Sequence, residues 1–276
     1  RALSARFGLA EAAADLQLLR DLISEHGAVE LVAATDGNHG RAVAHTARLL
    51  GIPSRIFFPA GLTAEAKSAI AGEGAEVVEL TVPYDDVVAA ATTYARTAGE
   101  GTVLVQDTAW QGYEEVPQWI VDGYSTLFEE ADEQLARAGA ERVDLVAVPV
   151  GVGSLAQAAV RHYRSGFRSG ASVLSVEAAN APAIIESLRA GRPVTVPTFP
   201  TVMAGLNCGT PSANAWPILR EGLDAAITVT DADAIRAVAD LEALGVDAGP
   251  CGAATLAGVR AWSLLTSLAA DAIVLL

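Results

Sequence analysis

The chain has 276 residues, of which 51% are hydrophobic and 18% charged, and its formal net charge is −15. This composition predicts a globular protein with a sizeable buried core, and no apolar run approaches the roughly 18 residues of a membrane span. The negative charge argues against nucleic acid as a partner, because phosphate groups bind basic surfaces. Two cysteines suggest a reducing compartment, so we expect a cytoplasmic protein. Four scattered histidines lack metal-ligand spacing, and we expect no metal site.

Strands and helices are predicted to alternate along the chain. Strands are expected at 29–36, 54–60, 75–80, 101–107, 142–150 and 172–178, and helices at 37–51, 63–74, 84–99, 121–139 and 154–166. This alternation predicts an α/β fold with parallel sheets flanked by helices. We place a smaller lobe at 28–112 and a larger lobe at 1–27 and 113–276, because Gly and Pro interrupt the pattern near 110–120.

The stretch TDGNHG, residues 35–40, joins a predicted buried strand to a helix. In one interpretation, its Thr, Asp and Asn are simply the cap of the helix and the residues of a turn. The two glycines beside Asn38 suggest instead a loop wrapped closely around a ligand, with Asp36 placed to act as a base. Asp107 ends a later strand, and it reads equally well as a cap or as a functional acid. Ligands of open α/β sheets bind at such strand ends. TDGNHG, QDTAW (106–110) and PVGVGS (149–154) all follow predicted strands, so they could converge on one site.

The stretch VPVGVGSLAQA, residues 148–158, places two glycines between a strand and a helix. Gly151 and Gly153 leave backbone amides bare and Ser154 offers a hydroxyl, which favours phosphate binding over a purely structural turn. Residues 151–156 also read G-x-G-x-x-A, and Glu177 ends the next strand where a ribose-binding acid would lie. A nicotinamide dinucleotide site is therefore a second interpretation.

Together with MAGLNCGTPS (203–212) and GPCGAATLAG (249–258), these motifs resemble diaminopropionate ammonia-lyase from about Ser4 to the C-terminus. The resemblance implies the pyridoxal-phosphate fold type II shared with tryptophan synthase β chain and threonine dehydratase. In that fold two α/β lobes hold pyridoxal 5'-phosphate between them, usually in a homodimer. The implied reaction is α,β-elimination of ammonia from the small amino acid 2,3-diaminopropionate, which yields pyruvate and a second ammonia.

The resemblance also implies roles for individual residues. Asn38, beside Gly37, would hold the ring hydroxyl of the cofactor, and Asp36 and Asp107 would be the acid/base residues. The cofactor phosphate would lie against the backbone of the segment Gly151, Val152, Gly153, Ser154 and Leu155. Two carboxylates in different environments can divide the duties of base and acid.

The family also needs a lysine for its Schiff base, in a segment resembling RFGL-x-A-F-K-x-L-G. Here SARFGLA (4–10) matches the start, but EAAADLQLLRDL (11–22) follows without the Phe-Lys pair. Lys67, the single lysine, lies on a predicted exposed helix, and we do not expect it to take this role. We expect that the sequence omits segments of a larger protein. The alternatives are a non-catalytic relative without the lysine and a serine or threonine dehydratase-like β-eliminase.

Overall fold

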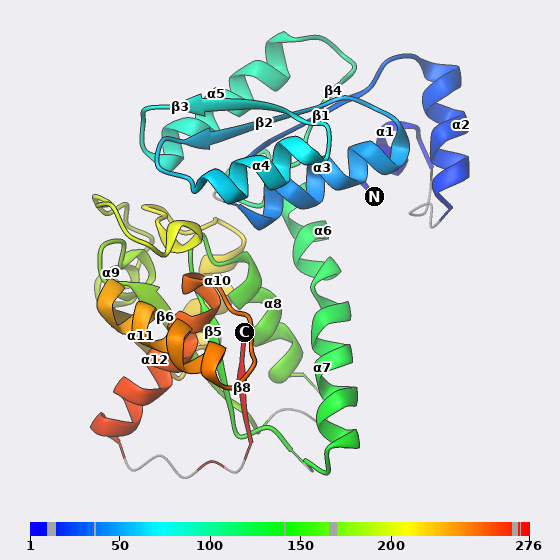
Figure 1. Cartoon of the computed structure of the whole chain (residues 1–276). Helices are drawn as coiled ribbons and strands as arrows, with labels where there is room; N and C mark the ends of the chain where they lie inside the picture. The colour runs from blue at the N-terminus through cyan, green and yellow to red at the C-terminus, as the bar shows by residue number, and fades with distance from the viewer. Residues whose placement is uncertain (10–14, 36, 141, 166–169, 267–269, 271) are drawn as a thin grey trace. The chain divides into compact units, whose positions relative to one another are not determined.

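The structure is a computed structural model that describes residues 1–9, 15–35, 37–140, 142–165, 170–266, 270 and 272–276 (Figure 1). Contacts divide the chain into two compact units, unit 1 (Arg1–Asp107) and unit 2 (Thr108–Leu276). Each unit contains a four-stranded sheet whose paired strands are all parallel. The predicted α/β fold with parallel sheets is confirmed. None of the helices in the described ranges is long and apolar enough to cross a membrane.

Unit 1 has a sheet of strand order β3-β2-β1-β4. Its elements are, in chain order, α1 (Ala2–Arg6), α2 (Leu16–His26), β1 (Glu30–Ala34), α3 (Asn38–Leu50), β2 (Ser54–Pro59), α4 (Ala64–Gly72), β3 (Glu76–Leu80), α5 (Tyr84–Thr97) and β4 (Thr102–Leu104). In the register of the sheet, Leu31 of β1 pairs with Ser54 of β2 and with Val103 of β4.

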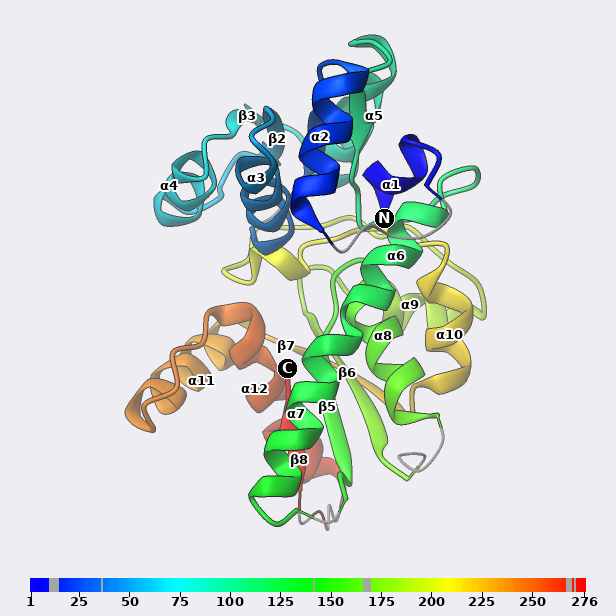
Figure 2. The ribbon, with the colours of Figure 1, turned by 90° about the vertical axis from the view of Figure 1, so that its right-hand side faces the viewer.

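Alternate side chains of β1 enter two separate cores. Leu31 and Ala33 lie in the core that α3 covers with Val43, whereas Val32 and Ala34 lie in the core that α5 covers. Figures 1 and 2 show α3 and α5 on opposite sides of the sheet. A strand buried on both faces reads as a continuous apolar run, which is why β1 was predictable from the sequence.

The N-terminal helices belong to unit 1 by their packing. Leu3 of α1 and Leu19 of α2 are buried in the same core as Leu31 and Val43. This grouping differs from the predicted lobes, which placed residues 1–27 with 113–276. Burial of these leucines beside the β1–α3 layer accounts for the difference, because removing apolar surface from water drives the packing.

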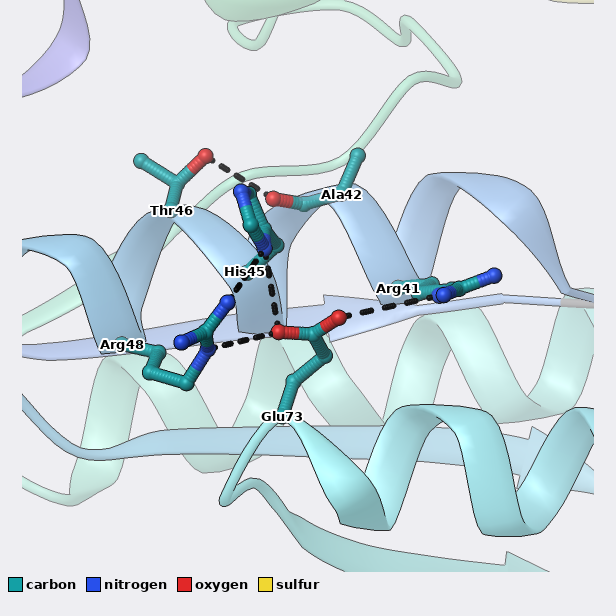
Figure 3. A network of polar contacts seen from close by, with 6 residues as sticks. All are labelled: Arg41, Ala42, His45, Thr46, Arg48 and Glu73. Atoms are coloured by element: carbon teal, nitrogen blue, oxygen red, sulfur yellow. Dashed lines mark hydrogen bonds and ion pairs between the residues drawn. The ribbon is translucent and has the colours of Figure 1, made fainter.

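The polar face of α3 is tied to α4 through Glu73 (Figure 3). Arg41, His45 and Arg48 follow one another at helical spacing. Arg41 Nε, His45 Nδ1 and Arg48 Nε lie 3.7, 3.0 and 2.8 Å from the carboxylate oxygens of Glu73. Hydrogen bonds with His45 and Arg48 hold the pKa of Glu73 below its ordinary value. The cluster therefore fixes α4 beside α3 while the apolar face of α3 packs on the sheet.

Unit 2 has a sheet of strand order β7-β6-β5-β8. Its elements are α6 (Glu115–Gly123), α7 (Ser125–Arg137), β5 (Leu145–Pro149), α8 (Ser154–Tyr163), β6 (Ser172–Ala178), α9 (Ala183–Ala190), the 3₁₀ turn η2 (Ala204–Leu206), α10 (Ala215–Gly222), β7 (Ala225–Val229), α11 (Asp231–Ala243), α12 (Pro250–Leu265) and β8 (Ile273–Leu275). Val146 and Val148 of β5 face the core shared with α8, whereas Leu145 and Ala147 face the core shared with α12.

The segment predicted as a break, 110–120, is largely ordered secondary structure. Trp110 and Tyr113 form an isolated antiparallel bridge, and their rings stack with centroids 4.4 Å apart. Helix α6 then begins at Glu115, ahead of Pro117. A proline in the first turn of a helix removes an N–H that has no intrahelical partner, so it does not interrupt the helix.

Candidate active site

The turn between β1 and α3 is organised by Thr35, which is 1% exposed. Its Oγ1 accepts hydrogen bonds from the N–H groups of Gly37 and Gly40, each at 2.9 Å. Gly37 has φ +151°, a conformation that favours glycine. The threonine hydroxyl thus satisfies two donors at the start of α3, as an N-terminal cap does. Asp36, one of the two predicted acid/base residues, lies outside the described residues.

Packing around this turn leaves no room for a side chain at Gly40. A Cβ there would lie 2.3 Å from Cγ2 of Thr35 and 2.8 Å from Cγ2 of Ile56. His39 Nε2 lies 2.7 Å from the carbonyl oxygen of Val105, which joins α3 to the chain ahead of Asp107. The side chain of Asn38 is exposed at the first residue of α3.

Asp107 lies just after the end of β4. The strand ends there because the side chain of Gln106, and not a backbone carbonyl, accepts the next hydrogen bond from β1. The N–H of Val105 still donates to the Val32 carbonyl at 2.8 Å. The next donor of β1, the N–H of Ala34, bonds to Oε1 of Gln106 at 2.9 Å, where a backbone carbonyl would continue the ladder. The strand predicted over 101–107 therefore covers only Thr102–Leu104. Gln106 Nε2 in turn donates to Asp107 Oδ1 at 2.9 Å.

These features meet at one edge of the unit 1 sheet. Strands β1 and β4 are parallel neighbours, so the turn with Thr35 and Asn38 and the residue Asp107 both follow carboxyl ends at the same edge. The described residues of TDGNHG therefore lie at the same edge of the unit 1 sheet as Gln106 and Asp107. Convergence of these segments with PVGVGS on one site stays a prediction. Thr35 and Gln106 hold this edge together. The motif predicted a possible cap role for Thr35, whereas no role was predicted for Gln106.

The glycine loop of unit 2 follows the carboxyl end of β5. A Cβ on Gly151 would lie 2.5 Å from the carbonyl oxygen of Gly205, and Gly153 has φ +103° with Leu219 Cδ1 2.9 Å from its Cβ position. Both positions therefore require glycine for structural reasons. The N–H of Ser212 fixes the loop by donating to the Val152 carbonyl at 2.8 Å.

The first turn of α8 has the backbone N–H groups that were predicted from the sequence to bind an anion. Gly153 is the N-terminal cap, and glycine has no side chain that could bond the first N–H groups of the helix. Those N–H groups have no intrahelical acceptors and lie at the positive end of the helix dipole, so they suit a phosphate. Ser154 is 3% exposed and lies in this first turn. The assignment of Gly151 to Leu155 to the cofactor phosphate remains a prediction that this geometry fits.

The segment packed on Gly151 contains an unsatisfied polar atom. Oδ1 of Asn207 is buried and has no hydrogen-bond partner within the described part of the chain. Asn207 follows η2, whose Gly205 touches the glycine loop. A bound molecule with a donor at this place would satisfy the amide oxygen.

Glu177 does not act as the dinucleotide interpretation requires. Its side chain is 0% exposed, and it accepts the N–H groups of Ile184 at 2.7 Å and Ile185 at 2.8 Å. Burial raises the pKa of Glu177 to about 7, although the two backbone hydrogen bonds oppose this shift. Both carboxylate oxygens are engaged at the start of α9, so none is presented to a ribose.

The model of the pyridoxal-phosphate dependent enzyme family matches residues 9–276. The chain belongs to this family. Its cofactor is therefore pyridoxal 5'-phosphate, and the nicotinamide interpretation was wrong. The family also explains why the glycine loop leads into a helix N-terminus suited to a single phosphate.

The chain is similar to known ammonia-lyases of this family. It is 38% identical over 204 residues to the diaminopropionate ammonia-lyase of Salmonella typhimurium, an alignment that covers 72% of this chain and 50% of the relative. It is 30% identical over 233 residues to the L-threonine ammonia-lyase of Geobacter sulfurreducens, covering 83% of this chain and 54% of the relative. The chain thus spans about half the length of these curated relatives.

The fold is also similar to a solved structure. The crystal structure of diaminopropionate ammonia-lyase from Escherichia coli in complex with D-serine superposes with a TM-score of 0.85 and 31% sequence identity. The match covers 99% of this chain and 71% of that chain. The fold type II assignment made from the sequence is confirmed by these relatives.

The lysine of this sequence is engaged elsewhere in unit 1. Lys67 lies on α4, and its Nζ is 2.7 Å from Oε1 of Glu79 and 5.4 Å from the ring centroid of Phe58. The residues at the start of α8 fit the cofactor phosphate, whereas Lys67 pairs with a carboxylate on the neighbouring strand β3. That Lys67 does not serve as the Schiff-base lysine stays a prediction.

Proposed function

We propose that the protein catalyses the α,β-elimination of ammonia from 2,3-diaminopropionate, and that water then hydrolyses the unsaturated product to pyruvate and a second ammonia. The 38% identity to diaminopropionate ammonia-lyase carries this proposal, because it exceeds the 30% identity to the L-threonine ammonia-lyase of Geobacter sulfurreducens. The presence of Asp107 at the carboxyl edge of the unit 1 sheet supports it. We further propose a homodimer, as the family resemblance implies, and a cytoplasmic location, as the two cysteines suggest.

The residues of this chain would divide the work as follows. The start of α8, from Gly151 to Leu155, would hold the cofactor phosphate, and Asn38 would bond the ring hydroxyl. When bound, pyridoxal phosphate withdraws electrons from Cα of an amino-acid substrate. Asp36 and Asp107 would exchange the protons: one carboxylate takes the Cα proton, and a carboxylic acid protonates the β-amino group so that it leaves as neutral ammonia.

Substrate preference tests the proposal. We expect the full-length protein with pyridoxal phosphate to release pyruvate from 2,3-diaminopropionate with a kcat/KM at least about tenfold above that for serine. Release of 2-oxobutyrate from threonine should be weaker still. A higher kcat/KM for serine or threonine would favour the dehydratase-like alternative, and no keto acid from any of the three would favour the non-catalytic alternative.

The Schiff-base lysine has its own test. We expect the full-length protein, treated with pyridoxal phosphate and reduced with borohydride, to carry one pyridoxyl group on a lysine that lies outside these 276 residues. Intact mass and peptide mass spectrometry would locate it, and the chain mass should exceed 28.3 kDa. A Lys67→Arg variant is the matched control and should keep the adduct. A chain of 28.3 kDa without an adduct would contradict the proposal.

A further inference from the structure

Gln106 is a buried polar residue that lies directly before Asp107. Its side chain is 0% exposed and bonds several groups of unit 1. Oε1 accepts the N–H of Ala34 at 2.9 Å, while Nε2 donates to the Tyr84 hydroxyl at 3.0 Å and to Asp107 Oδ1 at 2.9 Å. One amide thus connects the end of β1, the first residue of α5 and the carboxylate of Asp107.

The partners of Gln106 leave its amide a single orientation. A backbone N–H can only donate, so the amide oxygen must face Ala34. The NH₂ group must then face Tyr84 and Asp107, and each of its two hydrogens has an acceptor. Rotating the amide by 180° would place NH₂ against the N–H of Ala34 and leave buried donors without acceptors, which costs free energy.

The two residues differ in burial, which fits different duties. Gln106 is enclosed, whereas the side chain of Asp107 is partly exposed at the sheet edge. A carboxylate on a short side chain can turn about its last bond unless a partner holds one oxygen. The bond from Gln106 Nε2 supplies that hold, and the bond from Ala34 anchors Gln106 to a buried strand of the sheet.

We propose that Gln106 is a positioning residue that fixes the carboxylate of Asp107 in its working orientation. The catalytic part of this inference rests on the proposed function, in which Asp107 exchanges a proton with the substrate. The N–H of Ala34 already fixes which way the Gln106 amide faces, and the Tyr84 hydroxyl only accepts the second hydrogen of its NH₂ group. Loss of the Gln106 amide should therefore affect the chemical step, whereas loss of the Tyr84 hydroxyl should affect mainly stability.

Two variants of the full-length holoenzyme test the kinetic part. Gln106→Leu keeps the size but removes the donor, and we expect kcat to fall by about tenfold to a hundredfold with KM changed less than about twofold. Tyr84→Phe, the matched control, should lower Tm to a similar extent and keep kcat within about threefold of wild type. Unchanged kcat in Gln106→Leu, or an equal loss of kcat in both variants, would overturn the inference.

A third variant, Gln106→Glu, separates positioning from packing. When protonated, the introduced carboxyl group can accept from the N–H of Ala34 and donate its O–H to Asp107, whereas an ionised one repels the neighbouring carboxylate. The activity of Gln106→Glu relative to Gln106→Leu should therefore rise as pH is lowered. A ratio independent of pH would overturn the inference, because a purely structural role would not follow protonation.

A measurement without turnover separates this inference from the proposed function. Selective ¹⁵N-glutamine labelling should reveal a Gln106 side-chain amide that exchanges slowly with solvent, identified by its absence in Gln106→Leu. Asp107→Ala should accelerate this exchange at least about tenfold. Slow exchange and its loss in Asp107→Ala, in a protein inactive on diaminopropionate, would retain the placement of Gln106 and reject the proposed function. Fast exchange in wild type would overturn the inference whatever the activity.

Discussion

Replacing Asp107 by asparagine is expected to lower kcat for elimination from 2,3-diaminopropionate by about 10² to 10⁴ while pyridoxal phosphate remains bound. General acid–base catalysis by one side chain contributes a factor of this size. The substitution tests proton exchange alone, because the Asn amide oxygen can still accept from Gln106 Nε2, as Asp107 Oδ1 does at 2.9 Å. The local geometry is therefore kept and only the ability to exchange a proton is lost.

Steady-state kinetics of the full-length protein would measure the loss, and the visible absorbance of the cofactor would report its binding. Asp86→Asn is the matched control, since Asp86 is an exposed aspartate in the first turn of α5 in the same unit. This control should turn over within about twofold of wild type. Near-normal turnover in Asp107→Asn would remove Asp107 from the mechanism, and loss of the cofactor absorbance would point to a structural role.

The strands up to β6 could be predicted from the sequence because most of them are buried on both faces. Strands β1, β2, β5 and β6 each lie within the predicted ranges, and most of their side chains are buried. β3 also lies within its predicted range, although it is an edge strand that contains Glu76 and Glu79. Residues 213–246, for which no element was predicted, form α10, β7 and α11. β7 is an edge strand whose side chains are mostly half-buried, and it was missed although its sequence, AAITV, is apolar. The capping box of Thr230 and Asp233 was a readable signal for the start of α11.

For the candidate site too, some residues could be predicted from the sequence and others could not. Asn38, Asp107 and the glycines of the β5–α8 loop could be proposed as site residues from motifs at strand ends, and their roles stay predictions. Residues that hold them were missed, because their function depends on contacts far along the chain. Gln106 bonds the N–H of Ala34, which is 72 positions away. Only the pairing of β1 with β4 brings these groups together, and no local pattern encodes it.

Glu177 is expected to make unit 2 less stable as pH rises from 4.5 to about 7. Burial raises the pKa of Glu177 from 4.5 to about 7, so within this range the folded protein holds a proton that the unfolded chain releases. The contribution of this group to stability is fully present below pH 4.5 and is lost as pH rises through 7. By linkage the loss amounts to about 3 kcal/mol.

Glu177→Gln cannot ionise, so the difference in unfolding free energy between wild type and this variant should shrink by that amount between about pH 4.5 and 8. Urea unfolding followed by tryptophan fluorescence would measure it, because all four tryptophans lie in unit 2. Glu186→Gln is the matched control. Glu186 lies in the first turn of α9, and its charge is the smallest of the causes that shift the pKa of Glu177, so the wild-type slope should largely persist.

The sign of the slope decides between two opposing effects on the Glu177 carboxyl group. Burial favours its neutral form, whereas the N–H groups of Ile184 and Ile185 favour the charged form. Equal slopes in wild type and Glu177→Gln would show that the carboxyl group titrates alike in the folded and unfolded chain. An opposite slope would show that the two N–H groups outweigh the cost of burying the charge.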